Sequence, residues 1–150
     1  MIDLDTLKEH IFEVVGALFE VHKELGPGLN EYCYQEGFKL QLEEQEIPFK
    51  RELVIHPTYH GKPLEAVYRV DFLCKEDIIV ECKSVEMLNG DMRAQLFNYM
   101  RICDINRGLL INFGEMSLRT ERYLYLPEDD DFVLITKDNY KDYIDDFQVV

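Results

Sequence analysis

Cationic side chains are scarce in this chain of 150 residues. Sixteen Lys and Arg stand against 30 Asp and Glu, which gives a formal net charge of −14. Proteins that bind nucleic acid draw most of their affinity from cations that neutralise phosphates, so a chain this acidic should repel a polyanion. The stretch 127–150 is especially acidic, with eight Asp and Glu and two Lys. The charge favours a basic partner or a small substrate over unaided binding to nucleic acid.

Several other features are missing. None of the four cysteines has the C-x2-C spacing common in zinc sites, so we expect reduced thiols, with Cys74 and Cys82 buried as small hydrophobic side chains. No apolar run reaches the length of a transmembrane helix, and residues 1–5 lack the pattern of a signal peptide. Low-complexity segments are also absent. These absences predict a cytoplasmic protein with no membrane partner and a sizeable core.

Two short apolar runs carry charged side chains that burial does not require. Asp71 lies in the first run, and Glu81 and Lys83 lie in the second. Because side chains alternate along a strand, Glu81 and Lys83 share a face. The polar residues between the runs predict a hairpin, and a turn centred on Glu76 would place Asp71 opposite Glu81. A two-residue turn would instead place Asp71 opposite Cys82.

Like charges placed opposite each other destabilise a hairpin, and a divalent cation between them would reverse that effect. Two carboxylates form a hard oxygen site suited to Mg²⁺ or Mn²⁺, which would activate a water and stabilise charge on a phosphate. Lys83 could orient that water or neutralise the developing oxyanion. The alternative is an exposed hairpin face whose Glu/Lys pair contributes little. The pattern alone does not favour the metal site over the exposed hairpin face.

A longer series of motifs follows the same order as in a known family. Gly28, Glu31 and Tyr34 have the spacing G-x-x-E-x-x-Y. Further matching segments are 20–22, 25–28, 51–53, 59–62, 68–72, 94–96, 98–99 and 108–114. Together they resemble the GxxExxY proteins, a branch of the PD-(D/E)XK nuclease superfamily, over about residues 8–126.

The resemblance implies an α/β fold in which helices flank a small mixed central β-sheet, with a restriction-endonuclease-like core. It also implies the metal ligands, which would be Glu31, Asp71, Glu81 and the backbone carbonyl of Cys82. Lys83 would be the catalytic lysine.

Two positions on a later helix complete the resemblance. Gln95 and Tyr99 are similar to the QxxxY element of helicase-associated nucleases, which helps to position the metal site and the substrate. Their spacing alone fits an ordinary helix surface, since residues four apart are neighbours there. Many relatives carry a His three residues before the Gln, where this chain has Met92. That departure predicts the loss of one auxiliary substrate contact.

Apolar periodicity and turn residues predict the elements of this fold. Helices are expected over 4–25, from a cap at Asn30 to about Glu44, and over 91–103. Strands are expected over 49–56, 64–74, 78–83, 108–113, 119–126 and 132–135. A final short helix should carry an apolar stripe formed by Tyr140, Tyr143, Ile144 and Phe147. Residues 1–126 would form the nuclease-like domain, and 127–150 an acidic extension packed on it.

The leading interpretation is a metal-dependent nuclease acting on DNA or RNA, with Arg69, Arg119 and Arg122 as candidate substrate contacts. The acidic charge supports an alternative, a non-catalytic protein on the same fold that binds a basic partner. A third interpretation is an enzyme acting on a small phosphorylated substrate. An apolar patch on the tail would also be compatible with a homodimer. Metal binding that depends on Asp71 separates the first interpretation from the second.

Overall fold

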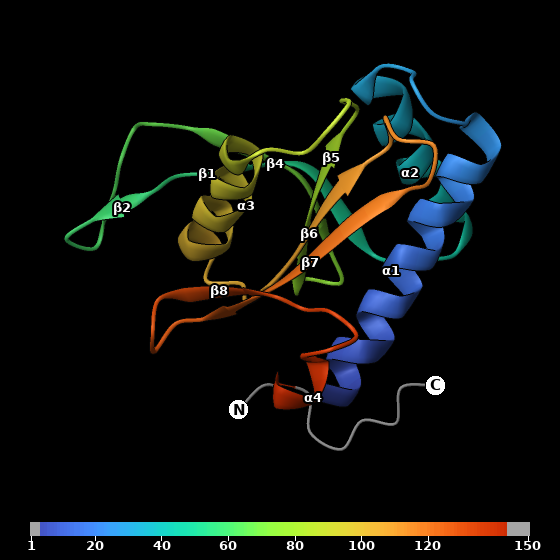
Figure 1. Cartoon of the computed structure of the whole chain (residues 1–150). Helices are drawn as coiled ribbons and strands as arrows, with labels where there is room; N and C mark the ends of the chain where they lie inside the picture. The colour runs from blue at the N-terminus through green and yellow to red at the C-terminus, as the bar shows by residue number, and fades with distance from the viewer. Residues whose placement is uncertain (1–3, 144–150) are drawn as a thin grey trace.

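A six-stranded mixed sheet forms the centre of the molecule (Figure 1). The computed structural model describes residues 4–143, without the side chains of 4–8 and 141. The strand order is β1-β4-β5-β6-β7-β8; β5 and β6 are parallel, and the other neighbouring pairs are antiparallel. The strands are β1 (Phe49–Ile55), β4 (Tyr68–Cys74), β5 (Ile78–Lys83), β6 (Arg107–Asn112), β7 (Arg119–Leu126) and β8 (Asp131–Leu134). The expected α/β, restriction-endonuclease-like fold is confirmed.

Helices cover both faces of this sheet. The long helix α1 (Leu4–Leu25) and α2 (Glu31–Glu44) lie on one face, and α3 (Gly90–Cys103) lies on the other (Figure 1). The side-chain oxygen of Asn30 caps α2 by accepting a hydrogen bond from the Cys33 amide at 2.9 Å. Asn89 caps α3 in the same way. Both caps satisfy donors that the first helical turn would otherwise leave free, and the helix bounds expected from the sequence are confirmed to within a residue.

Two separate cores result from this layering. Ile78, Val80 and Cys82 of β5 pack toward α1 and α2, whereas Ile79 packs toward α3. The alternation confirms that Glu81 and Lys83 belong to the α3 side of the sheet. Cys74 and Cys82 are confirmed as buried free thiols.

The hairpin between β4 and β5 has the expected register. Pairing of Phe72 with Val80, and of Cys74 with Ile78, leaves a three-residue loop and places Asp71 opposite Glu81. Asp77 in this loop is 2.7 Å from Arg107 of β6. A slip of one residue would turn the carboxylates away from each other, so this anchoring of the loop matters to the site.

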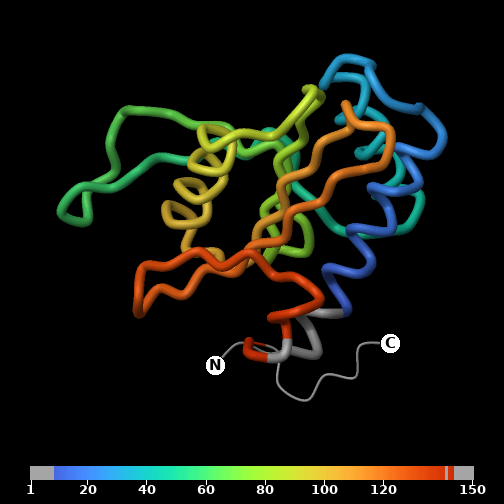
Figure 2. The backbone as a smooth tube through the Cα atoms, in the orientation of Figure 1, coloured from blue at the N-terminus to red at the C-terminus, as the bar shows by residue number. Residues whose placement is uncertain are grey.

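The strand expected over 64–74 begins four residues later than expected, at Tyr68. Residues 64–67 are irregular, and β2 (Thr58–Tyr59) pairs with β3 (Lys62–Pro63) in a small hairpin of its own. His60 and Gly61 both have positive φ, as the tightest hairpin turns require. Residues 56–67 therefore form an arm that projects from the sheet beyond α3 (Figure 2).

Alternation also fails at one point in β4. Strict alternation would place Val70 on the same face as Phe72, but Val70 packs in the α3-side core while Phe72 packs toward α2. The ladder between β1 and β4 skips Glu52, opposite Asp71, where φ is 51°. This interruption lets the strand twist locally beside Asp71.

The C-terminal part of the described chain joins the same sheet. Strand β8 pairs with β7 as an edge strand, as expected, and α4 (Tyr140–Tyr143) follows it. Ile144 and Phe147, the other half of the expected apolar stripe, lie outside the described residues. The division of the chain at residue 126 stays a prediction. Among the described residues, no helix has the length and hydropathy needed to cross a membrane.

Candidate functional site

The carboxyl groups of Asp71 and Glu81 meet on the α3 side of the sheet. Glu81 Oε1 accepts a hydrogen bond from the Asp71 amide at 3.2 Å, and Asp71 Oδ2 accepts one from the Cys82 amide at 2.8 Å. Each carboxylate therefore reaches across the β4–β5 ladder to the backbone of the other strand. These bonds hold the two side chains in place at the centre of the sheet.

Burial makes this pair electrostatically costly. Only 2% of Glu81 is exposed. Desolvation raises the pKa of Glu81 well above its usual range, and the neighbouring Asp71 carboxylate raises it further. Lys83 opposes this shift, but less strongly. Two carboxyl groups in such surroundings need a bound proton or a cation between them.

Lys83 connects the acid pair to α3. Its Nζ donates a hydrogen bond to Gln95 Oε1 at 3.0 Å. One turn further along α3, Tyr99 lies near both acids: burial raises the pKa of its hydroxyl most, followed by the charges of Glu81 and Asp71. The structure thus brings together the five side chains that the sequence nominated as catalytic.

Glu31 approaches the same place from the other side of the sheet, at the start of α2. Burial raises its pKa, while Lys83 lowers it and Asp71 raises it, so its carboxyl lies within electrostatic reach of both. The Tyr34 hydroxyl holds the preceding turn, donating to the Gly26 carbonyl and accepting from the Leu29 amide at 3.0 Å. In the signature Gly28-x-x-Glu31-x-x-Tyr34, the tyrosine therefore shapes the turn that presents the glutamate.

Asn112 fixes the chain just after Lys83, a role that sequence reasoning missed. Its fully buried amide accepts from the amides of Val85 and Gly114, each at 3.0 Å, and donates to the Val85 carbonyl at 2.9 Å. A Cβ on Gly114 would lie 2.2 Å from that carbonyl oxygen, so only glycine fits. A lone polar residue in the otherwise apolar segment 108–113 was the available signal.

The donor set suits a hard divalent cation. Carboxylate oxygens are the ligands that Mg²⁺ and Mn²⁺ prefer, and the charge gathered on Asp71 and Glu81 is what such an ion would neutralise. Within residues 4–143, however, no three His, Cys, Asp or Glu side chains are grouped closely enough to hold one ion. Asp71 and Glu81 form a pair, and participation by Glu31 and the Cys82 carbonyl stays a prediction.

Among the described residues, none of the three nominated arginines has a hydrogen bond or ion pair with Asp71 or Glu81. Arg69 is exposed, two residues before Asp71 on β4. The Nη2 atom of Arg119 donates to Glu121 at 3.3 Å. Glu121 faces α3, so the adjacent Arg122 points to the opposite face of the sheet, where burial lowers its pKa. Their role as substrate contacts stays a prediction.

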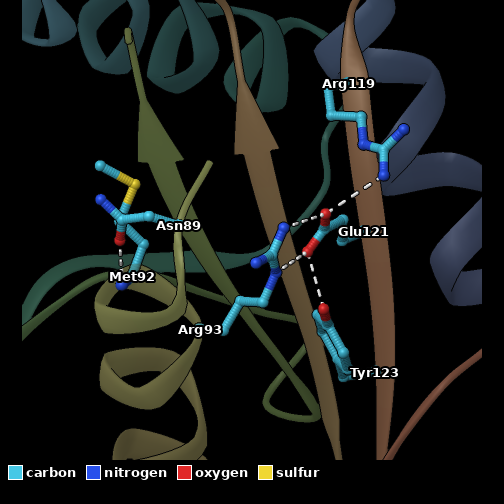
Figure 3. Close-up of polar contacts among 6 residues, drawn as sticks. All are labelled: Asn89, Met92, Arg93, Arg119, Glu121 and Tyr123. Atoms are coloured by element: carbon cyan, nitrogen blue, oxygen red, sulfur yellow. Dashed lines mark hydrogen bonds and ion pairs between the residues drawn. The ribbon is translucent and has the colours of Figure 1, made fainter. Parts of the chain in front are cut away.

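Figure 3 shows a second polar cluster, which connects α3 to β7. Arg93 donates to both oxygens of Glu121, at 2.8 and 3.0 Å, and the Tyr123 hydroxyl donates to the same carboxylate at 2.7 Å. The bonds from Arg93 lower the pKa of Glu121 to about 2. Met92, where the resemblance implied a His, packs against the α3-side core. Sequence reasoning missed this cluster, and an acid among aromatic residues of a strand was its only signal.

A mixed sheet with helices on both faces, and two acids meeting on adjacent central strands, define a restriction-endonuclease-like α/β protein. The chain belongs to the PD-(D/E)XK nuclease superfamily, whose family model matches residues 8–123. The finer resemblance to the GxxExxY branch stays a prediction. Neither a curated protein nor a solved structure gives a significant match.

Proposed function

We propose that this protein is a metal-dependent nuclease that hydrolyses phosphodiester bonds of DNA or RNA. The observation that supports the proposal most directly is the contact between Asp71 and the buried Glu81, two acids that destabilise each other unless a proton or a cation lies between them. A structural pair would instead have an arginine partner, as Glu121 has. Membership of the nuclease superfamily supports the same activity.

Asp71 and Glu81 would hold Mg²⁺ or Mn²⁺, with Glu31 and the Cys82 carbonyl as further ligands. The ion would supply Lewis-acid stabilisation of the phosphate and a water of lowered pKa. Lys83 places its ammonium group beside the acid pair, where it can neutralise charge that develops on the phosphate. Gln95 orients that ammonium through its 3.0 Å hydrogen bond. Tyr99, on α3, lies near both acids and would help to keep bulk water away from Glu81.

The acidic charge supports a second candidate, a non-catalytic protein that binds a basic partner. The chain carries −14, and residues 127–150 account for −6 of it. Such a protein would bind its partner through long-range attraction that weakens as salt rises. It would not need a metal ion at Asp71.

Calorimetric titration with Mn²⁺ and Mg²⁺ tests the proposal. We expect wild type to bind, and Asp71→Asn to lose about tenfold or more in affinity because one carboxylate ligand is gone. Lys83→Met should keep the metal and lower the hydrolysis rate by about 10²–10³-fold, the effect of removing one stabilising group. Glu65→Gln, a matched loss of one negative charge on the exposed arm, should change neither quantity.

Metal binding that is equal in wild type and Asp71→Asn would contradict the proposal. So would hydrolysis that survives in Lys83→Met. If millimolar metal does not bind at all, the acidic interaction protein becomes the better interpretation, and binding to a basic partner at low and high salt is the next measurement.

A further inference from the structure

A hollow of about 330 Å³ lies between the arm and α3, next to the candidate site. Pro57 of the arm and Tyr68, the first residue of β4, form one side, and one exposed face of α3 forms the other side. Gln95, which accepts the hydrogen bond from Lys83, and Tyr99 both line the hollow, so it lies beside the candidate site although neither acid lines it. Its volume is within the range of pockets that bind small organic groups.

The chemistry of this hollow fits a nucleobase better than a phosphate. The Tyr68 side chain is 46% exposed, and its ring centroid lies 6.1 Å from that of Tyr99. Asn98 adds a neutral amide, and Asp91 adds an acceptor for an amino group. Stacking on aromatic rings and hydrogen bonds to amides are how proteins hold unpaired bases.

The charged groups in the wall argue against a phosphate. Arg101 is the cation there, but its Nε is 3.1 Å from Asp130 and its Nη1 donates to Asn98 at 3.2 Å. Asp91 would repel a phosphate. In a chain of charge −14, stacking is also a way to gain affinity for nucleic acid that does not depend on cations.

We propose that this hollow binds an unpaired base of the nucleic-acid substrate, next to the phosphodiester that the acid pair cleaves. The inference rests on the proposed nuclease function and deepens it by naming the substrate class. A base stacked and paired in a duplex cannot enter a side pocket without leaving its helix. The protein therefore prefers single-stranded DNA or RNA, or duplexes with an unpaired nucleotide.

Binding to fluorescein-labelled oligothymidylate and oligouridylate, alone and as duplexes with oligoadenylate, tests this by fluorescence anisotropy in Ca²⁺. We expect Tyr68→Ala to raise the Kd for a single strand about tenfold, the usual effect of removing one stacking ring, and Tyr68→Phe to restore it. Tyr59→Ala is the matched control, because Tyr59 is 65% exposed at the tip of the same arm and does not line the hollow. Its Kd should stay within about twofold of wild type.

A substrate without a base separates this inference from the proposed function. Hydrolysis of bis(4-nitrophenyl) phosphate should require Asp71 and Lys83 but not Tyr68. Loss of that hydrolysis in Asp71→Asn together with an unchanged Kd in Tyr68→Ala would overturn the pocket and leave the nuclease. Tighter binding of wild type to duplex than to single strand would also overturn it. So would a dimer that Tyr68→Ala dissociates, because a second copy would then fill the hollow.

Discussion

Glu81 and Glu121 are equally buried glutamates on the same side of one sheet, and their surroundings are opposite. Each is 2% exposed. Arg93, Arg119 and Tyr123 all donate to Glu121, and its pKa falls to about 2. Glu81 faces another acid, and its pKa rises.

The difference supports our proposal that Glu121 is kept for structure and Glu81 for chemistry. A buried carboxylate with three donors is stable as an anion and joins α3 to β7. A buried carboxylate beside another carboxylate weakens the fold, and such strain is common at functional sites. Burial alone does not separate the two cases, but the sign of the pKa shift does.

Replacing each glutamate by glutamine should give the largest difference, and it should appear in the free energy of unfolding. Glu121→Gln should lower the free energy of unfolding by about 3 kcal/mol, the value of a pKa shift from 4.5 to about 2. Glu81→Gln should raise it by about 1 kcal/mol in EDTA, because the amide removes a repulsion and keeps the shape. Urea unfolding of both variants checks the signs. Destabilisation of similar size in both would show that the two acids play the same structural role.

The second largest effect should appear in how stability depends on pH in acid, because of Glu121. Its folded pKa lies below the unfolded value, so its contribution is complete above about pH 4.5 and is lost as pH falls toward about 2. The slope reaches about 1.4 kcal/mol per pH unit for one proton. Unfolding midpoints between pH 5 and pH 2.5 should therefore fall less in Glu121→Gln than in wild type. Glu81→Gln should steepen the fall slightly, because wild-type Glu81, with its raised folded pKa, gains stability as pH falls toward about 4.5. A flattened slope in that variant would contradict the assignment.

Local patterns predicted the parts of the fold that depend on near neighbours. The bounds of α2 and α3 follow from caps at Asn30 and Asn89, and the register of Asp71 against Glu81 follows from the length of one hairpin. These features need only a few consecutive residues to specify them. The arm was misjudged because the His60–Gly61 turn makes a separate short hairpin where a longer strand was expected.

The rest depended on contacts between distant residues. Arg93 and Glu121 are 28 positions apart, and nothing in either segment indicates the other. Asn112 reaches back to Val85 for the same reason. The resemblance to a nuclease family nominated the site residues, but the hydrogen bond from Lys83 to Gln95 required the fold to bring β5 and α3 together.

Replacing Tyr123 or Tyr99 by phenylalanine should give the smallest changes, and each variant should change a different property. Tyr123 donates its hydroxyl to the ionised Glu121, so Tyr123→Phe should lower the free energy of unfolding by about 2 kcal/mol, the usual contribution of one hydrogen bond to a charged group. The Tyr99 hydroxyl lies near the acid pair, so Tyr99→Phe should change stability by less than about 0.5 kcal/mol and should slow hydrolysis instead. Thermal unfolding and a nuclease assay on both variants separate the two effects. If Tyr99→Phe destabilises the fold and leaves hydrolysis intact, Tyr99 belongs with Tyr123 as a structural residue, and the functional side of the comparison shrinks to the acid pair, Lys83 and Gln95.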